Sequence, residues 1–218
     1  MRPDALLIDL DNTLYGYSTA NNAAKLATEK ELSRIVGKPV ESVRMAIHEA
    51  RSITHKNLHG TASSHSRLLY FQRALELLGE TRYECLVEIH SLFWEIYFAN
   101  LVPSEGAKEF LERISLPKCL VTDFTAELQF RKLAKLGMLG LFDYVVTSEE
   151  IGAEKPNPKI FQAALKKLNV QASKAAVIGD DFEKDIRGAV TLGMRAFWFT
   201  PAGDDMPASL PGVQSFTS

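Results

Sequence analysis

Two carboxylates and a hydroxyl follow the first apolar run of the chain. Asp9, Asp11 and Thr13 stand at alternate positions directly after the run 6–8. Two acidic groups so close repel each other unless a cation lies between them or one of them holds a proton. Both conditions suit phosphoryl chemistry, in which one aspartate attacks phosphorus, another handles a proton and Mg²⁺ neutralises phosphate charge. We therefore expect a catalytic site here.

Three further groups of polar residues follow apolar runs later in the chain. Thr122 follows the run 119–121, and its hydroxyl and the neighbouring backbone N–H groups are suited to holding phosphate oxygens. Lys155 is suited to neutralising the charges of a nucleophile and a phosphate. Gly179 precedes a segment with three aspartates, whose carboxylates are hard oxygen ligands of the kind that Mg²⁺ prefers: Asp180, Asp181 and Asp185.

Each of these signals has a structural explanation when it is taken alone. An Asp-x-Asp pair arises by chance, and a Lys-Pro pair is usually a solvated turn. Thr122, Asp180 and Asp181 would also serve as helix caps. Four such signals at the ends of four expected strands, in this order, favour a functional site over coincidence.

The elements expected around these residues alternate between strand and helix. We expect strands at 5–8, 118–121, 144–146, 175–178 and 196–199, and helices at 125–136, 157–168 and 184–192. Runs that are apolar on both faces are typical of buried parallel strands. The alternation indicates an α/β fold with a Rossmann-like, doubly wound parallel sheet. Ligands of such sheets bind at the carboxyl ends of the strands, where the four signals fall.

The pattern between the first and second expected strands is helical. We expect four helices there, at 19–36, 40–53, 66–78 and 83–99. Their apolar residues recur at spacings of three and four, as at Leu68, Leu69 and Leu75. We therefore expect a Rossmann-like catalytic core formed by 1–15 and 102–218, with an inserted α-helical subdomain at 16–101.

The polar groups at the strand ends resemble the motifs of the haloacid dehalogenase superfamily, whose members are mostly Mg²⁺-dependent phosphatases. The segment 9–13 is similar to the first motif, Thr122 to the second, Lys155 to the third and the segment 179–194 to the fourth. The resemblance covers nearly the whole chain. It implies that the helical insert is a cap that closes over the active site.

The resemblance also implies a mechanism and a cofactor. Asp9 would be the nucleophile that forms an aspartyl-phosphate, and Asp11 the general acid and base, its proton affinity raised by neighbouring carboxylates. Mg²⁺ would be held by the Asp9 carboxylate, the Asp11 backbone carbonyl and Asp180. Thr122 and Lys155 would hold the transferring phosphate.

Further residues have supporting parts in this expectation. Thr13, Asp181 and Asp185 would support the site, the last two by orienting the metal ligands or Lys155. Asp123 stands where many members have an asparagine, so the side-chain amide is replaced, while its backbone N–H remains suited to a phosphate oxygen.

The stretch 51–67 within the insert is rich in histidine and arginine. His65 and Arg67 are candidates for contact with an anionic or hydroxylated leaving group. The alternative is a polar, solvated connection between two helices, and the sequence favours that alternative.

Three other functions share parts of this pattern. A haloacid dehalogenase uses the same fold and nucleophile but does not need a carboxylate at the position of Asp11. A phosphomutase would keep both aspartates. A phospho-accepting signalling domain also uses strand-end aspartates, a threonine and a Lys-Pro pair, but receiver domains are much shorter and lack a helical insert. We therefore expect a phosphatase that acts on a small phosphate ester.

Composition narrows the expected partners. A net charge of −2 over 218 residues gives no reason to expect nucleic acid or an anionic membrane as a partner. No apolar run approaches the roughly 18 residues of a membrane span, and no signal-peptide pattern is seen. Cys85 and Cys119 lie too far apart in sequence to form a metal-ligand pair. We expect a cytoplasmic protein with reduced thiols, whose oligomeric state the sequence does not reveal.

Overall fold

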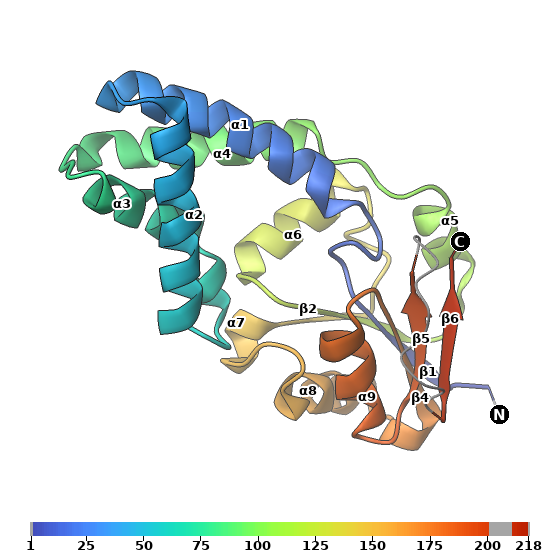
Figure 1. The fold of residues 1–218 in the computed structure, drawn as a ribbon. Helices are drawn as coiled ribbons and strands as arrows, with labels where there is room; N and C mark the ends of the chain where they lie inside the picture. The colour runs from blue at the N-terminus through green and yellow to red at the C-terminus, as the bar shows by residue number, and fades with distance from the viewer. Residues whose placement is uncertain (1, 201–210, 218) are drawn as a thin grey trace. The chain divides into compact units, whose positions relative to one another are not determined.

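The computed structural model describes residues 2–200 and 211–217. The chain divides into two compact units, one formed by Met1–Gly16 with Val102–Ser218 and the other by Tyr17–Leu101. Figure 1 labels the helices and strands of both units.

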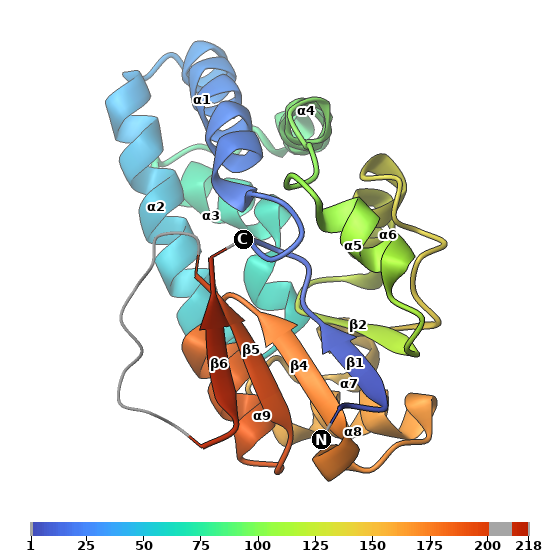
Figure 2. The ribbon, with the colours of Figure 1, turned by 90° about the vertical axis from the view of Figure 1, so that its right-hand side faces the viewer.

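The first unit is built on a parallel β-sheet (Figures 1 and 2). In the described part of the chain the sheet has six strands: β1 (Ala5–Ile8), β2 (Lys118–Thr122), β3 (Tyr144–Thr147), β4 (Ala175–Gly179), β5 (Arg195–Phe199) and β6 (Val213–Phe216). Their order is β3-β2-β1-β4-β5-β6, and every neighbouring pair is parallel. This order confirms the expected doubly wound sheet, and β6 adds an edge strand that the sequence pattern did not predict.

Strands β1 and β4 lie side by side within the sheet (Figure 2). Leu7 is paired with Val177, and Ile8 with Ile178. Every residue of the two strands is buried, which is why both read as uninterrupted apolar runs. The strand order reverses between β1 and β4, and open α/β sheets bind their ligands beyond the carboxyl ends of the strands at such a point.

Short helices connect the strands of this unit. They are α5 (Ala107–Arg113), α6 (Ala126–Lys135), α7 (Ser148–Ile151), α8 (Pro158–Leu168) and α9 (Gly188–Val190). Helix α8 packs against β1, β2 and β3. Its buried face contributes Ile160, Phe161 and Ala164 to a core that also contains Val121 and Val146. This packing covers one face of the strands that carry the candidate site.

The segment after β4 differs from the sequence expectation of an α-helix at 184–192. The structure has a π-helical turn at Phe182–Arg187, followed by the short α9. Oδ1 of Asp181 accepts hydrogen bonds from the backbone N–H groups of Glu183 and Lys184, both at 3.0 Å. Asp181 therefore caps this turn, as its sequence position allowed, but apolar periodicity does not distinguish a π-turn, which is frequent at functional sites, from an α-helix.

The second unit is helical in its described residues. It contains α1 (Tyr17–Val36), α2 (Val40–Asn57), α3 (Arg67–Leu77) and α4 (Leu86–Ala99), with 3₁₀ turns at Ala62–His65 and Tyr83–Cys85. Helix α1 packs along α4, and α2 packs against α3 (Figure 1). Leu32 of α1 and the aromatic residues Phe93 and Tyr97 of α4 are buried in this unit. Among the described helices, none combines the length and the apolar character needed to span a membrane.

Candidate active site

Asp9 comes directly after β1, and its side chain is almost completely buried. Its backbone N–H donates to the carbonyl of Ile178 at 2.9 Å. This hydrogen bond continues the pairing of β1 with β4 and so fixes the backbone position of Asp9. Oδ1 of Asp9 accepts a hydrogen bond from Nζ of Lys155 at 2.5 Å, and Oδ2 accepts one from the hydroxyl of Thr13 at 2.9 Å. The carboxylate is therefore held in one orientation by two donors from different segments.

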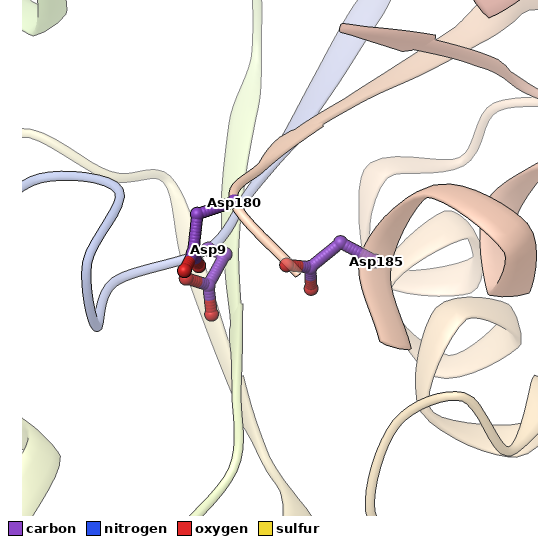
Figure 3. Close-up of side chains that lie close together, drawn as sticks. All are labelled: Asp9, Asp180 and Asp185. Atoms are coloured by element: carbon purple, nitrogen blue, oxygen red, sulfur yellow. The ribbon is translucent and has the colours of Figure 1, made fainter. Parts of the chain in front are cut away.

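Asp180 and Asp185 bring two more carboxylates close to Asp9 (Figure 3). One oxygen atom from each of the three side chains lies within 4.8 Å of the others. Asp180 follows β4, the neighbour of β1, and Asp185 comes from the π-helical turn. Oδ1 of Asp180 also lies 3.4 Å from the hydroxyl of Thr13. Three hard oxygen ligands that converge in this way are suited to a divalent cation.

The charge state of this cluster supports the same assignment. The pKa of Asp9 and of Asp180 is raised to about 7, and that of Asp185 to about 6, with burial as the largest cause in each case. In the raised pKa of Asp9, the Lys155 ammonium partly opposes the effect of burial, and repulsion from Asp185 and Asp11 adds to it. One ammonium does not balance three converging carboxylates, of which Asp9 and Asp185 are buried and Asp180 is half-buried. The donor set therefore fits a bound metal ion, which would supply the missing positive charge.

Lys155 links two members of the cluster. Its Nζ donates to Asp9 and, at 2.7 Å, to Oδ1 of Asp185. Burial alone would lower the pKa of Lys155, but Asp185 and Asp9 raise it well above the ordinary value. This raised pKa favours the charged ammonium, which is the form suited to neutralising phosphate charge.

Gly179 at the end of β4 allows Asp185 to approach the strand. A Cβ atom at position 179 would lie 2.5 Å from Cγ of Asp185, which is closer than real contacts allow. Oδ2 of Asp185 also accepts a hydrogen bond from the backbone N–H of Asp181 at 3.1 Å. The glycine is thus required by a close approach of a side chain and not by an unusual backbone angle.

Asp11 lies two residues beyond Asp9 but has different partners. Its Oδ1 accepts hydrogen bonds from Nζ of Lys132, at 2.5 Å, and from the hydroxyl of Tyr15. Its Oδ2 accepts one from Nε2 of Gln129 at 2.9 Å. Burial raises the pKa of Asp11, but Lys132 and these hydrogen bonds outweigh it and lower the pKa below the ordinary value. The expectation that neighbouring carboxylates raise the proton affinity of Asp11 is therefore wrong.

Gln129 and Lys132 were missed in the sequence. Both lie on α6 and are fully buried. Together with Leu133 and Leu136 they occupy the positions at spacings of three and four that face the protein interior. A lysine and a glutamine in an otherwise apolar stripe are the signal that would have revealed them.

Thr122 is the last residue of β2 and is fully buried. Its hydroxyl accepts a hydrogen bond from Nε2 of Gln129 and donates one to the carbonyl of Asp123 at 3.3 Å. Because Nε2 of Gln129 also contacts Asp11, this amide connects the candidate phosphate-binding threonine with the second aspartate.

The carboxylate of Asp123 holds two other loops in place. Its Oδ1 accepts a hydrogen bond from the backbone N–H of Lys155 at 3.0 Å, and its Oδ2 lies 2.9 Å from Nζ of Lys184. Burial would lower the pKa of Lys184, but Asp123 raises it above the ordinary value. Lys184 therefore balances the negative charge of Asp123, which stands where many family members have a neutral asparagine.

His65 and Arg67 lie in the helical unit. Nη1 of Arg67 donates to the carbonyl of His65 at 2.8 Å, and Nη2 donates to the hydroxyl of Tyr17. The guanidinium lies 5.3 Å from the ring centroids of both Tyr70 and Phe93. Arg67 also lines a cavity of about 650 Å³ within this unit, so the 51–67 stretch is not merely a solvated connection.

The sequence-predicted residues of the first unit thus form two connected groups. Thr13 and Lys155 contact the carboxylate of Asp9, which lies in a cluster with those of Asp180 and Asp185. Asp11 and Thr122 share the amide of Gln129. The first group offers an anionic nucleophile beside a cation site, and the second offers an ionisable group beside a hydroxyl. The combination is suited to phosphoryl transfer, in which positioning and charge stabilisation do most of the catalysis.

Comparison with known proteins gives matches over most of the chain. Residues 3–193 match the family described as haloacid dehalogenase-like hydrolase. The chain is 37% identical over 204 residues to a ribulose-1,5-bisphosphate 5-phosphatase of Halopiger xanaduensis, covering 91% of this chain and 85% of the relative. It is 32% identical over 194 residues to a glyceraldehyde 3-phosphate phosphatase of Methanopyrus kandleri, covering 87% of this chain and 81% of the relative.

The fold is similar to that of a solved structure. The crystal structure of a HAD phosphatase from Thermococcus onnurineus superimposes with a TM-score of 0.77. The alignment covers 100% of this chain and 94% of the other chain at 24% sequence identity. At this sequence identity, the structural similarity establishes the fold.

Proposed function

The chain belongs to the haloacid dehalogenase-like hydrolase family, and we propose that this phosphatase cleaves small phosphate monoesters through an aspartyl-phosphate intermediate. The observation that carries the proposal is the surroundings of Asp9. Its buried carboxylate lies 2.5 Å from the Lys155 ammonium and belongs to a cluster of three converging carboxylates. Such an oriented and charge-compensated carboxylate is suited to covalent catalysis.

Asp9 attacks the phosphorus atom of the ester with a carboxylate oxygen. A bond forms between that oxygen and phosphorus, the bond between phosphorus and the ester oxygen breaks, and Asp11 gives a proton to the leaving alkoxide. Water then attacks the aspartyl-phosphate and gives its proton to Asp11. Inorganic phosphate leaves, and the carboxylate of Asp9 is restored.

Asp11 alternates between acid and base in this scheme. Its partners Lys132, Tyr15 and Gln129 favour the ionised carboxylate, which is the form that accepts the proton of water in the second step. The first step needs the protonated form, so Asp11 takes up a proton before the alkoxide leaves.

We propose Mg²⁺ as the cofactor. The carboxylates of Asp9 and Asp180 and the backbone carbonyl of Asp11 would hold it, with the carboxylate of Asp185 close by. When bound, the ion neutralises phosphate charge and orients the ester for in-line attack. Full activity in excess chelator would contradict this part of the proposal.

The phosphate itself would be held by donors from two loops. Thr122 contributes its hydroxyl, Asp123 its backbone N–H and Lys155 its ammonium. The Asp123 carboxylate supports them indirectly, because it accepts the backbone N–H of Lys155 and binds Lys184. Thr13, Asp181 and Asp185 have supporting roles through their hydrogen bonds to Asp9, the π-helical turn and Lys155.

We propose a short phosphorylated carbohydrate as the substrate. The two relatives described above are named for ribulose-1,5-bisphosphate and glyceraldehyde 3-phosphate, which both belong to this class. We further propose that the helical unit is a cap that takes part in substrate choice. Arg67 and His65 are its candidate contacts for polar groups of the substrate.

A substrate panel tests the proposed function. Phosphate release would be measured with Mg²⁺ for ribulose-1,5-bisphosphate, glyceraldehyde 3-phosphate, hexose phosphates and nucleoside monophosphates. We expect turnover of at least one short sugar phosphate and none by the Asp9→Asn variant. Absence of phosphate release from every ester would overturn the assignment.

The same assays separate the rival functions. Faster release of halide from 2-haloacids than of phosphate from esters would favour a dehalogenase. Conversion of one sugar phosphate into its isomer without release of phosphate would favour a mutase. A phosphorylated protein that persists for minutes would favour a signalling domain.

A further inference from the structure

We propose that Lys132, Gln129 and Tyr15 are positioning residues that hold the carboxylate of Asp11 in its working orientation. The inference rests on the proposed function, in which Asp11 exchanges a proton with the leaving group and with water. It adds three residues that lie outside the four sequence motifs.

Lys132 contacts Asp11 from the interior of the first unit. Its side chain is completely buried, and its Nζ lies 2.5 Å from Oδ1 of Asp11. The Nζ also lies 4.4 Å from the ring centroid of Phe124 and 5.7 Å from that of Tyr15. Removing a charge from water is costly unless it is paired, so Lys132 and Asp11 are strongly bound to each other.

Gln129 contacts the other oxygen of the same carboxylate. It lies one helical turn before Lys132 on the buried face of α6, and its Nε2 is 2.9 Å from Oδ2 of Asp11. The same amide nitrogen contacts the hydroxyl of Thr122 and lies 2.7 Å from the carbonyl of Asp123. With a donor on each oxygen, the plane of the Asp11 carboxylate is determined by α6.

Tyr15 adds a donor from the turn that carries Asp11 itself. Its hydroxyl donates to Oδ1 of Asp11, and the two residues are joined by a backbone bridge. The orientation of Asp11 is therefore defined by its own turn and by a helix more than a hundred positions later in the sequence. Holding a reacting group in place before the substrate arrives is a recognised source of rate enhancement.

The composition of the α6 face favours a functional role. A buried ion pair is weak evidence for stability, because well-packed apolar residues of similar volume are often at least as stable. The positions of Gln129 and Lys132 would suit leucine or methionine if packing were their sole purpose. Their polar atoms instead converge on one carboxylate.

The test compares Lys132→Met with the control Lys135→Met. Lys135 lies on the same helix but is exposed. Activity would be measured on p-nitrophenyl phosphate and on the alkyl phosphate of the panel that is turned over fastest.

A misplaced catalytic group costs about 10²-fold, so we expect Lys132→Met to lose about that factor in kcat on the alkyl phosphate, with KM nearly unchanged. The loss on p-nitrophenyl phosphate should be less than about tenfold, because its leaving group needs little protonation. Lys135→Met should match the wild type.

Asp11→Asn serves as the reference that separates two kinds of failure. If Asp11→Asn loses equal activity on both substrates, the acid-base role in the proposed function is wrong. If Asp11→Asn discriminates between the substrates but Lys132→Met loses equal activity on both, the positioning role is overturned and the proposed function stands.

A double variant checks that Lys132 acts through Asp11. If it does, Asp11→Asn/Lys132→Met is no slower than Asp11→Asn alone, whereas independent losses that multiply contradict the proposal.

Thermal unfolding verifies that each variant is folded. Should Lys132→Met not fold, Tyr15→Phe decides the matter, because it removes one hydroxyl and keeps the ring. We expect a selective loss on the alkyl phosphate, and wild-type rates on both substrates would overturn the proposal.

Discussion

Nζ of Lys155 lies 2.5 Å from Oδ1 of Asp9, and both side chains are almost completely buried. The contact gives the ammonium two effects on the Asp9 carboxylate, the proposed nucleophile. It fixes one oxygen of the carboxylate in space, and it opposes the protonation that burial favours. The remaining oxygen accepts a hydrogen bond from Thr13, so the carboxylate group of Asp9 is held against rotation.

The first prediction concerns this nucleophile. Asp9→Asn should abolish turnover, because an amide cannot form the aspartyl-phosphate. The matched control is Asp4→Asn, which changes an exposed carboxylate just before β1 and should leave the rate unchanged. Phosphate release measures both. A residual rate of Asp9→Asn within about tenfold of the wild type, a loss of only ~1.4 kcal/mol, would contradict the assignment.

The second prediction concerns pH and metal binding. In the metal-free folded protein the pKa of Asp9 and of Asp180 is about 7, against an ordinary value of 3.8. At pH values between about 4 and about 7, the folded state therefore binds more protons than the unfolded state. The free energy of unfolding without metal should therefore fall as the pH rises from about 4 to about 7. Because Mg²⁺ displaces these protons, its stabilising effect should grow over the same range.

Thermal unfolding with and without Mg²⁺ measures this effect. The increase in Tm caused by saturating Mg²⁺ should be larger at about pH 8 than at about pH 5.5. Asp180→Asn removes one of the two carboxylates and should reduce the difference. Identical increases at both pH values would show that these carboxylates do not bind the ion.

The third prediction concerns the close approach of Asp185 to the end of β4. Gly179→Ala introduces a Cβ that would lie 2.5 Å from Cγ of Asp185, so the side chain or the strand must move. Overpacking of this kind typically costs about 1–3 kcal/mol of stability. Gly140→Ala is the control, because a Cβ there meets no atom within 4 Å. If chemical denaturation gives equal stabilities for the two variants, the close approach is not real.

The fourth prediction concerns Asp123 and Lys184. Their charged atoms lie 2.9 Å apart, and the lysine side chain is 36% exposed, so solvent screens the pair. A double-mutant cycle with Asp123→Asn and Lys184→Met should give a coupling free energy of up to about 1 kcal/mol. The exposed pair Asp4 and Lys174 is the control and should give a value near zero. Equal coupling in both cycles would mean that the Asp123 contact contributes nothing to holding the loops.

The central strands of the sheet and the acidic residues beyond them could be predicted from the sequence for one physical reason. A parallel strand that is buried on both faces must be apolar throughout, so the first carboxylate after it marks its end, as Asp9 does after β1 and Asp180 after β4. The order of the strands then brings these ends together.

The partners of Asp11 could not be predicted in the same way. Lys132 and Gln129 belong to an amphipathic helix, in which polar residues usually face solvent. Their spacing relative to Leu133 and Leu136 indicates the inward face of α6, but only the packing of that helix shows that they contact Asp11. The edge strand β6 was missed for a related reason, since its middle residues Gln214 and Ser215 are exposed and give no apolar run.

The strand order also determines when the site can be assembled during synthesis. β1 is made long before β2, which begins at Lys118, and before β4, which begins at Ala175. At typical translation speeds the delay is on the order of ten seconds, during which an apolar segment has no partner. Contacts between segments so distant in sequence form slowly and leave strand edges exposed in the meantime. A nascent chain that stops before β4 therefore holds Asp9 but neither Asp180 nor Asp185, so the proposed metal site can be completed only after β4 and the turn that follows it have been made.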